Sequence, residues 1–183
     1  MTHAIYTLGM GRVSQAQARE NRKRIVETAS RLFRERGVAG VSVADVMAEV
    51  GLTHGGFYKQ FASKEALVAE AVGQAFTELS ENLEDQDRDD FVRGYLSPAH
   101  RDNPGPGCPA AGFAGDLAHE ADEQASAAVQ AYTRGIGLYA LELGSLADVA
   151  TLVGAMILAR ATAGTELSDR ILDEVRARLV SAA

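Results

Sequence analysis

Residues 42–67 read SVADVMAEVGLTHGGFYKQFASKEAL. Ser42 is a good helix N-cap, and the apolar residues after it recur at helical spacing. Gly51 interrupts this pattern, and glycine turns a chain tightly between helices because it tolerates positive φ. Thr53 can cap a second short helix, and Ser63 can cap a longer one. The stretch therefore predicts two short helices joined by a tight turn, followed by a long helix.

A longer helix is expected upstream, over residues 16–36, with Gly37 as its C-cap. Its apolar face consists of Ile25, Ala29, Leu32 and Phe33, whereas its basic residues, including Arg34, are expected largely outside that face. The second short helix should run from His54 to Gln60. This arrangement predicts a helix-turn-helix, whose second helix fits the major groove of DNA.

The second short helix has the residues that contact with DNA requires. Thr53, His54, Tyr58 and Lys59 are hydrogen-bond donors, and two glycines, Gly55 and Gly56, would let the backbone approach DNA closely. Each glycine weakens a helix by up to about 1 kcal/mol relative to alanine. The alternative is a plain helical hairpin in a core. Phe57 and Phe61 fit that alternative, but Tyr58 and Lys59 should project outward.

The charge distribution points the same way. The formal net charge is −7, but residues 1–70 hold ten Lys/Arg against seven Asp/Glu, and residues 71–183 hold eight against eighteen. A basic head on an acidic body is typical of a protein with one end facing nucleic acid. The most densely acidic stretch, residues 84–90, is expected to be a helix end or a loop.

Residues 25–37 (IVETASRLFRERG), together with residues 41–61 and 63–67, resemble the DNA-binding domain of the TetR family of bacterial regulators. The resemblance implies a ligand-responsive regulator, a repressor, that binds a palindromic operator as a homodimer and is released by a small-molecule effector. It implies that DNA-facing residues include Thr53, Gly55, Tyr58 and Lys59, and that Ser42 and Lys64 meet phosphates. His54, where the family often has a basic residue, completes the predicted DNA-binding set, and Gln60 stands where the family often has histidine.

The remainder of the chain is expected to be helical, because no segment shows the alternation of a strand. Helices are expected over residues 88–96, 110–119, 123–143, 146–163 and 168–180. The predicted fold is therefore all-α. Its parts are a flexible N-terminal arm (residues 1–15), a three-helix DNA-binding domain (16–66) and a helical bundle for effector binding and dimerisation (67–183).

Two residue sets are expected to act in the helical bundle. Candidate walls of an effector pocket are Phe76, Tyr95, Phe113, Tyr132, Tyr139 and Met156, although each of these also suits an ordinary core. The last two helices are the best candidates for a dimer interface, because the helix around residues 149–158 is too apolar for a monomer surface. The predicted interface residues are Val149, Leu152, Val153, Met156, Ile171, Val175 and Leu179.

Cys108 is the one cysteine, so an intrachain disulfide is excluded. It lies in a Gly/Pro-rich loop directly before an expected helix, whose N-terminus would lower the pKa of a thiol. An alternative function is therefore a thiol-based sensor of oxidants or electrophiles. The simpler interpretation is a small packed residue.

An enzyme is not expected, because the chain has no nucleophile elbow, P-loop, dinucleotide fingerprint or metal-ligand spacing of histidines. We expect no metal and no cofactor beyond an unidentified effector. No apolar run is long enough for a membrane helix, and a cytoplasmic location is expected. A helical protein-interaction module without DNA binding is the remaining alternative. The sequence does not specify the operator, the effector, the controlled genes or the direction of regulation.

Overall fold

The computed structural model describes residues 15–84, 86–118 and 126–180, and within these residues every regular element is an α-helix. The predicted all-α fold is confirmed. The predicted N-terminal arm lies outside the described residues except for its last residue. The helices are α1 (Gln15–Arg36), α2 (Val43–Val50), α3 (His54–Phe57), α4 (Lys64–Glu84), α5 (Arg88–Tyr95), α6 (Pro98–Asp102), α7 (Pro109–Ala118), α8 (Ala127–Leu143), α9 (Leu146–Ala161) and α10 (Glu166–Leu179).

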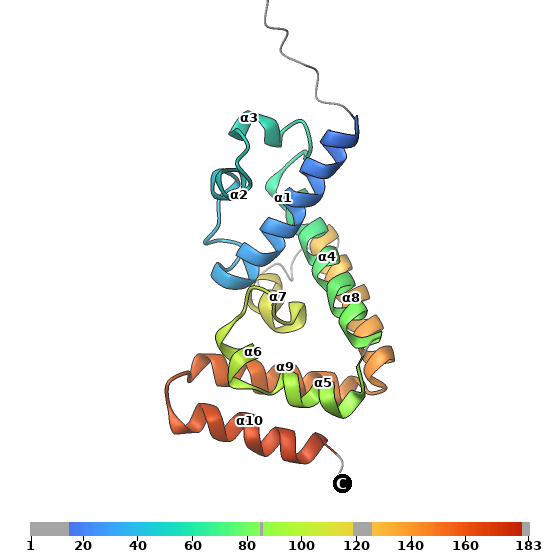
Figure 1. Ribbon diagram of the computed structural model, residues 1–183, viewed down its shortest axis with the longest axis vertical. Helices are drawn as coiled ribbons and strands as arrows, with labels where there is room; N and C mark the ends of the chain where they lie inside the picture. The colour runs from blue at the N-terminus through green and yellow to red at the C-terminus, as the bar shows by residue number, and fades with distance from the viewer. Residues whose placement is uncertain (1–14, 85, 119–125, 181–183) are drawn as a thin grey trace, which may run out of the picture.

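Helices α1, α2 and α3 form one end of the molecule, with α1 running diagonally beside the two short helices (Figure 1). Their apolar faces share one core, built from Ile25, Leu32, Phe33, Val46, Met47, Phe57 and Leu67. Ser42 and Asp45 form a capping box at the start of α2, and Gly51 ends α2 with a φ of 74°. That left-handed conformation strains any side-chain-bearing residue, which explains the turn glycine of the helix-turn-helix.

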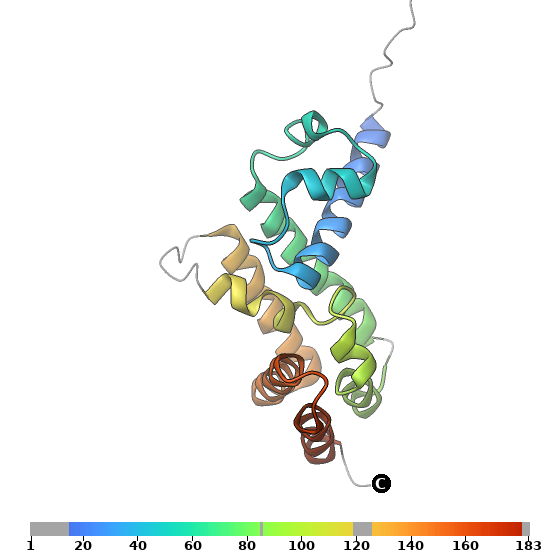
Figure 2. The same cartoon turned by 90° about the vertical axis from the view of Figure 1, so that its left-hand side faces the viewer.

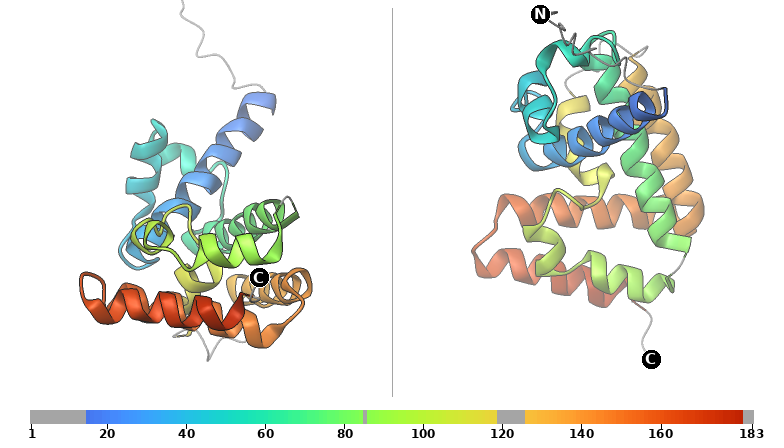
Figure 3. Two further views of the ribbon diagram at one scale, coloured as in Figure 1. Left: turned by 60° about the horizontal axis from the view of Figure 1, so that its bottom comes forward. Right: turned by 45° about the horizontal axis from the view of Figure 1, so that its top comes forward.

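Helix α4 runs from this end of the molecule into the rest of the chain and packs along α8 (Figure 2). Helices α9 and α10 lie side by side across the far end of α4 and α8 (Figure 3), and α8 meets α9 at an angle of 111°. The predicted domain boundary after residue 66 falls inside α4. The two parts of the molecule therefore share one continuous helix, which can transmit movement between them.

Several helices differ from the sequence prediction, most of them by one or two residues at an end. Helix α3 ends at Phe57 and not at Gln60, because two glycines weaken it and the last bonds are turn-like, with the Gln60 N–H donating to the Phe57 carbonyl at 2.8 Å. The short helix α6 was not predicted, although Ser97 caps it and Pro98 occupies its first position. Helix α10 begins two residues earlier than predicted because Thr165 caps it.

The helix-turn-helix end and the helical bundle are joined by polar contacts at the end of α1. Arg34 donates to the Gly107 carbonyl at 3.0 Å and to the Glu78 carboxylate at 3.2 Å. The Val38 N–H donates to the Asp116 carboxylate of α7 at 3.1 Å. The prediction that Arg34 lies outside the buried face is wrong, because only 4% of its side chain is exposed.

Candidate nucleic-acid interface and effector cavity

The residues at the second short helix that are predicted to contact DNA form one exposed surface, called the reading surface below. Thr53, His54, Gly55, Tyr58 and Lys59 are all exposed, and Tyr58 shows 63% of its area to solvent. The buried Phe57 ring anchors this surface, because it stacks on Phe61 at 5.3 Å between ring centroids. Thr53 stands at the N-cap position but makes no side-chain cap bond there. Its hydroxyl is therefore available to an external partner.

Gly55 is not required by the fold. A Cβ atom added there would meet nothing within 4 Å, and the residue is not in the left-handed region. Gly56 has ordinary van der Waals contacts at 3.5 Å and 3.7 Å, to Met47 and Thr53. A helix-weakening residue that no internal contact demands has a physical reason if an external backbone or phosphate approaches that position closely.

Ser42 is exposed, as the prediction of a phosphate contact requires, but its polar atoms have internal partners. Its hydroxyl donates to the Asp45 carboxylate at 2.6 Å, and its backbone N–H donates to the same carboxylate at 2.8 Å. These bonds lower the pKa of Asp45. The N-terminus of α2 is thus already capped by a negative charge, and a phosphate would have to displace it.

Several basic residues of this end of the molecule hold the fold together. The Lys64 ammonium donates to the Val38 carbonyl at 2.6 Å. Arg24 donates to the Val50 carbonyl at 2.8 Å, and Arg22 bonds both Gln60 and Glu70. Lys59 has no ion pair among the described residues. It is therefore the basic residue of the reading surface best placed for DNA.

A cavity with a volume of about 580 Å³ lies between α4, α5 and the loop before α7. A volume of this size suits a drug-sized ligand. Of the six predicted pocket residues, Tyr95 lines it, whereas Phe76, Phe113, Tyr132, Tyr139 and Met156 pack elsewhere. The sequence prediction named five aromatic residues and a methionine and omitted the polar part of the lining. That part includes Arg34, Glu78, Glu81 and His100.

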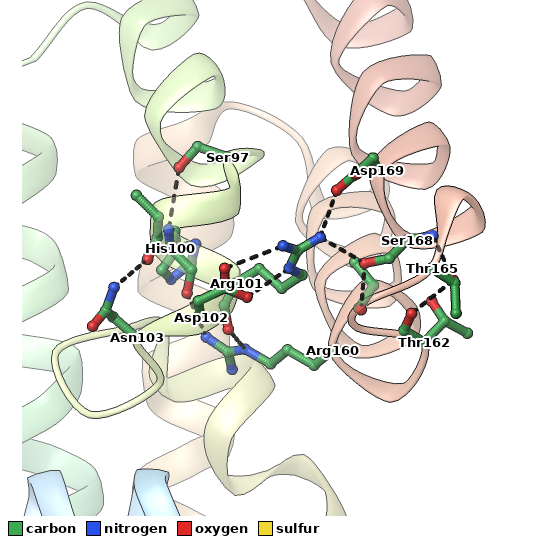
Figure 4. Close-up of polar contacts among 12 residues, drawn as sticks. Ser97, His100, Arg101, Asp102, Asn103, Arg160, Thr162, Thr165, Ser168 and Asp169 are labelled. Atoms are coloured by element: carbon green, nitrogen blue, oxygen red, sulfur yellow. Dashed lines mark hydrogen bonds and ion pairs between the residues drawn. The ribbon is translucent and has the colours of Figure 1, made fainter.

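His100 uses both nitrogens of its ring to shape the cavity wall. The Cys108 N–H donates to Nε2 at 3.0 Å, and Nδ1 lies 2.7 Å from the Tyr95 carbonyl, to which it donates. Burial lowers the pKa of His100, so the ring is neutral. Arg160 donates to the backbone carbonyls of His100 and Arg101, and Arg101 bonds Ser168 and Asp169 of α10 (Figure 4). This network fixes α6 against α9 and α10.

Cys108 is buried with 3% of its area exposed, and it lines the cavity. Burial raises the pKa of its thiol, although the neighbouring Tyr95 hydroxyl offsets part of the rise. The prediction of a lowered pKa at a helix N-terminus is therefore wrong, because desolvation of the thiolate is the larger effect. This geometry does not favour the alternative function as a thiol sensor.

The predicted dimer residues divide into two groups. Val149, Leu152 and Met156 are buried in the core of the protomer, so they offer no surface to a partner and this part of the prediction is corrected. Val153, Ile171, Val175 and Leu179 are half-buried. The large apolar side chains exposed on α8, α9 and the start of α10 are Leu138, Leu141, Leu146, Ile157, Leu158 and Leu167.

Neither a metal-binding cluster nor a single membrane-spanning helix occurs in the part of the chain that the structure describes. No group of three or more His, Cys, Asp or Glu residues there could hold a metal ion. No single described helix is both long enough and apolar enough to cross a membrane. Helices α8 and α9 have sufficient length and apolarity only when the two are counted as one bent pair.

Residues 25–71 match the family model described as bacterial regulatory proteins, tetR family. The regulator TtgR of Pseudomonas putida is 41% identical over 59 residues, which is 32% of this chain and 28% of TtgR. The repressor DhaR of a Mycobacterium species is 34% identical over 62 residues, 34% of this chain and 31% of DhaR. The chain thus matches less than a third of the length of these relatives. The crystal structure of reduced NemR from E. coli has a TM-score of 0.68 at 17% identity, over 87% of this chain and 95% of NemR, a likeness of fold.

Proposed function

Because residues 25–71 match the model of the tetR family of bacterial regulatory proteins, we propose that the whole chain is a ligand-responsive transcriptional repressor of the cytoplasm. It binds a palindromic operator as a homodimer and leaves it when a small molecule occupies the helical bundle. The observation that carries the proposal is the exposed surface of Thr53, Gly55, Tyr58 and Lys59 on a helix-turn-helix. No equivalent observation favours an enzyme or an interaction module.

The homodimer is supported by apolar surface that the protomer leaves uncovered. Leu146, Ile157 and Leu158 of α9 expose 62%, 40% and 57% of their area, and Val153 lies half-buried among them along the helix. Exposed apolar patches of this kind mark protein interfaces. A two-fold axis that pairs α9 and α10 with their copies would cover these side chains and present the two reading surfaces together.

The effector role is supported by the cavity and by its connection to the DNA-binding end. Arg34, at the end of α1, lines the cavity and bonds Gly107 and Glu78, which line it too. Helix α4 contributes one wall of the cavity and begins directly after the helix-turn-helix. A ligand that displaces the contact of Arg34 with Gly107 or with Glu78 would therefore shift α1 or α4.

The stoichiometry of the DNA complex tests this proposal. Sedimentation of the protein with a duplex that carries one selected operator should give two chains per duplex. Leu146→Arg and Leu158→Arg place charges in the proposed interface and should weaken both self-association and operator binding. One chain per operator, or operator binding untouched by these charges, would contradict the dimer.

A further inference from the structure

The cavity has a charge pattern that selects among effectors. The lining side chains that bear charge are Arg34, Glu78 and Glu81. The guanidinium of Arg34 is already bonded within the protein, because it donates to the Ser30 and Gly107 carbonyls and to Glu78. Its charge is thereby balanced by Glu78, and Glu81 remains at the exposed rim with no ion pair among the described residues. His100, also in the lining, is neutral.

The rim is negative for a second reason. The C-terminal turn of α4 ends there, and the carbonyl end of a helix carries a partial negative charge. Glu84 ends α4 one turn after Glu81, Asp87 caps the start of α5, and Gln86 between the two helices lines the cavity. The arginines of α5 do not neutralise the rim, because Arg88 pairs with Asp148 and Arg93 with Asp90.

The interior of the cavity is suited to an apolar ring. Leu79, Phe91, Pro106 and Pro109 contribute apolar surface to its wall. Tyr95, also in the wall, is 95% buried, and its hydroxyl lies beside the Cys108 thiol and bonds no nitrogen or oxygen atom of the described residues. A thiol is a weak hydrogen-bond partner, and a polar atom of a ligand can supply a stronger one.

We propose that the cavity takes a monovalent organic cation with an aromatic or otherwise apolar body, which rests on the proposed role of this cavity as the effector site. The body fills the pocket beside Phe91 and Tyr95, and the ammonium group lies at the rim near Glu81. Binding of an anion is disfavoured because the anion would be repelled by the carboxylates of Glu78 and Glu81. The guanidinium of Arg34 would not offset this repulsion, because it already donates to groups of the protein. An uncharged analogue keeps the apolar contacts but loses the attraction of the rim.

The test is calorimetric titration of the full-length protein, without DNA, with three probes that share one ring: naphthylmethylammonium, naphthylmethanol and naphthoate. The ammonium probe should bind about two- to fivefold more tightly than the alcohol, and naphthoate should bind most weakly. Glu81→Gln should remove most of the advantage of the ammonium probe and leave the alcohol unchanged. The matched control is Glu166→Gln on α10, which removes the same charge from an exposed residue outside the cavity lining.

Each outcome decides one question. If the alcohol or naphthoate binds as tightly as the ammonium probe, or if Glu81→Gln and Glu166→Gln behave alike, the cationic preference is wrong while the effector cavity stands. If none of the three probes binds, both the preference and the effector role of the cavity are overturned. Operator binding, measured separately, is unaffected by either result and tests the DNA-reading part of the proposed function.

Discussion

The guanidinium of Arg34 donates to the backbone carbonyl of Gly107 at 3.0 Å, across 73 residues of sequence. This bond joins the last turns of α1, in the DNA-binding end, to the loop that leads into α7 and lines the cavity. A buried charge is stable only when its hydrogen bonds are made, so the position of the loop and the position of α1 depend on one another.

Arg34→Met should therefore lower the free energy of unfolding by about 1–3 kcal/mol, because it leaves the buried Gly107 carbonyl without its donor. Urea denaturation measures this loss. The control is Arg31→Met on the same helix, whose ion pairs with Glu35 and Glu49 are largely solvent-exposed and should be worth less than about 1 kcal/mol. Equal losses in the two variants would show that Arg34 does not join the two parts.

Gly55→Ala should weaken operator binding by about tenfold without destabilising the fold. The added methyl group meets no atom of the protein within 4 Å, and alanine favours the helix, so a loss of affinity must come from contact with DNA. Fluorescence anisotropy with a labelled operator measures it. Gly115→Ala in α7, another exposed glycine with open space around it, serves as the control and should bind DNA normally.

Lys59→Ala should weaken binding to all DNA sequences alike and reduce the slope of log affinity against log salt by about 0.9, because one phosphate contact is lost. Binding titrations at several salt concentrations give the slope. Arg178→Ala removes an exposed charge from α10 at the other end of the molecule and should leave the slope unchanged. An unchanged slope in Lys59→Ala would remove this residue from the DNA interface.

His100 should make stability depend on pH. Its pKa in the folded state is below the ordinary 6.5, so below pH 6.5 the unfolded chain takes up a proton that the folded chain does not. The stabilisation is complete above pH 6.5 and falls as the pH decreases from there toward the folded-state pKa, with a slope of at most about 1.4 kcal/mol per pH unit. Urea denaturation over this range should give a shallower pH dependence for His100→Gln than for the parent. Parallel curves would mean that His100 does not contribute.

The sequence predicted the DNA-binding end better than the cavity, and the reason is physical. The Ser42 cap, the turn glycine Gly51 and the spacing of Phe57 and Phe61 are local signals, and the structure has each in the expected role. Thr53 occupies its predicted N-cap position but makes no side-chain cap bond. The cavity depends on contacts between distant segments. Nothing near Arg34 in sequence indicates a bond to Gly107, and the residue was placed on the polar side of α1. The room for the arginine stem comes from Gly112 of α7, where an added Cβ atom would lie 2.7 Å from Arg34 Cγ.

The burial of α9 illustrates the same limit. Its sequence is apolar over most of its circumference, which correctly indicated contacts on more than one side. It did not indicate which side meets α6, α7 and α8 and which is left for a partner. The fold assigns Val149, Leu152 and Met156 to the protomer core and leaves Leu146 and Leu158 exposed.

The measurement that tests the central claim most directly is selection of bound fragments from a pool of random double-stranded DNA by the purified full-length protein at low salt. A homodimer that reads DNA with two copies of α3 should enrich a palindrome whose half-sites are separated by about one helical turn. The absence of enrichment, at a salt concentration where even phosphate-driven binding is strong, would contradict the claim that this chain is a DNA-binding regulator.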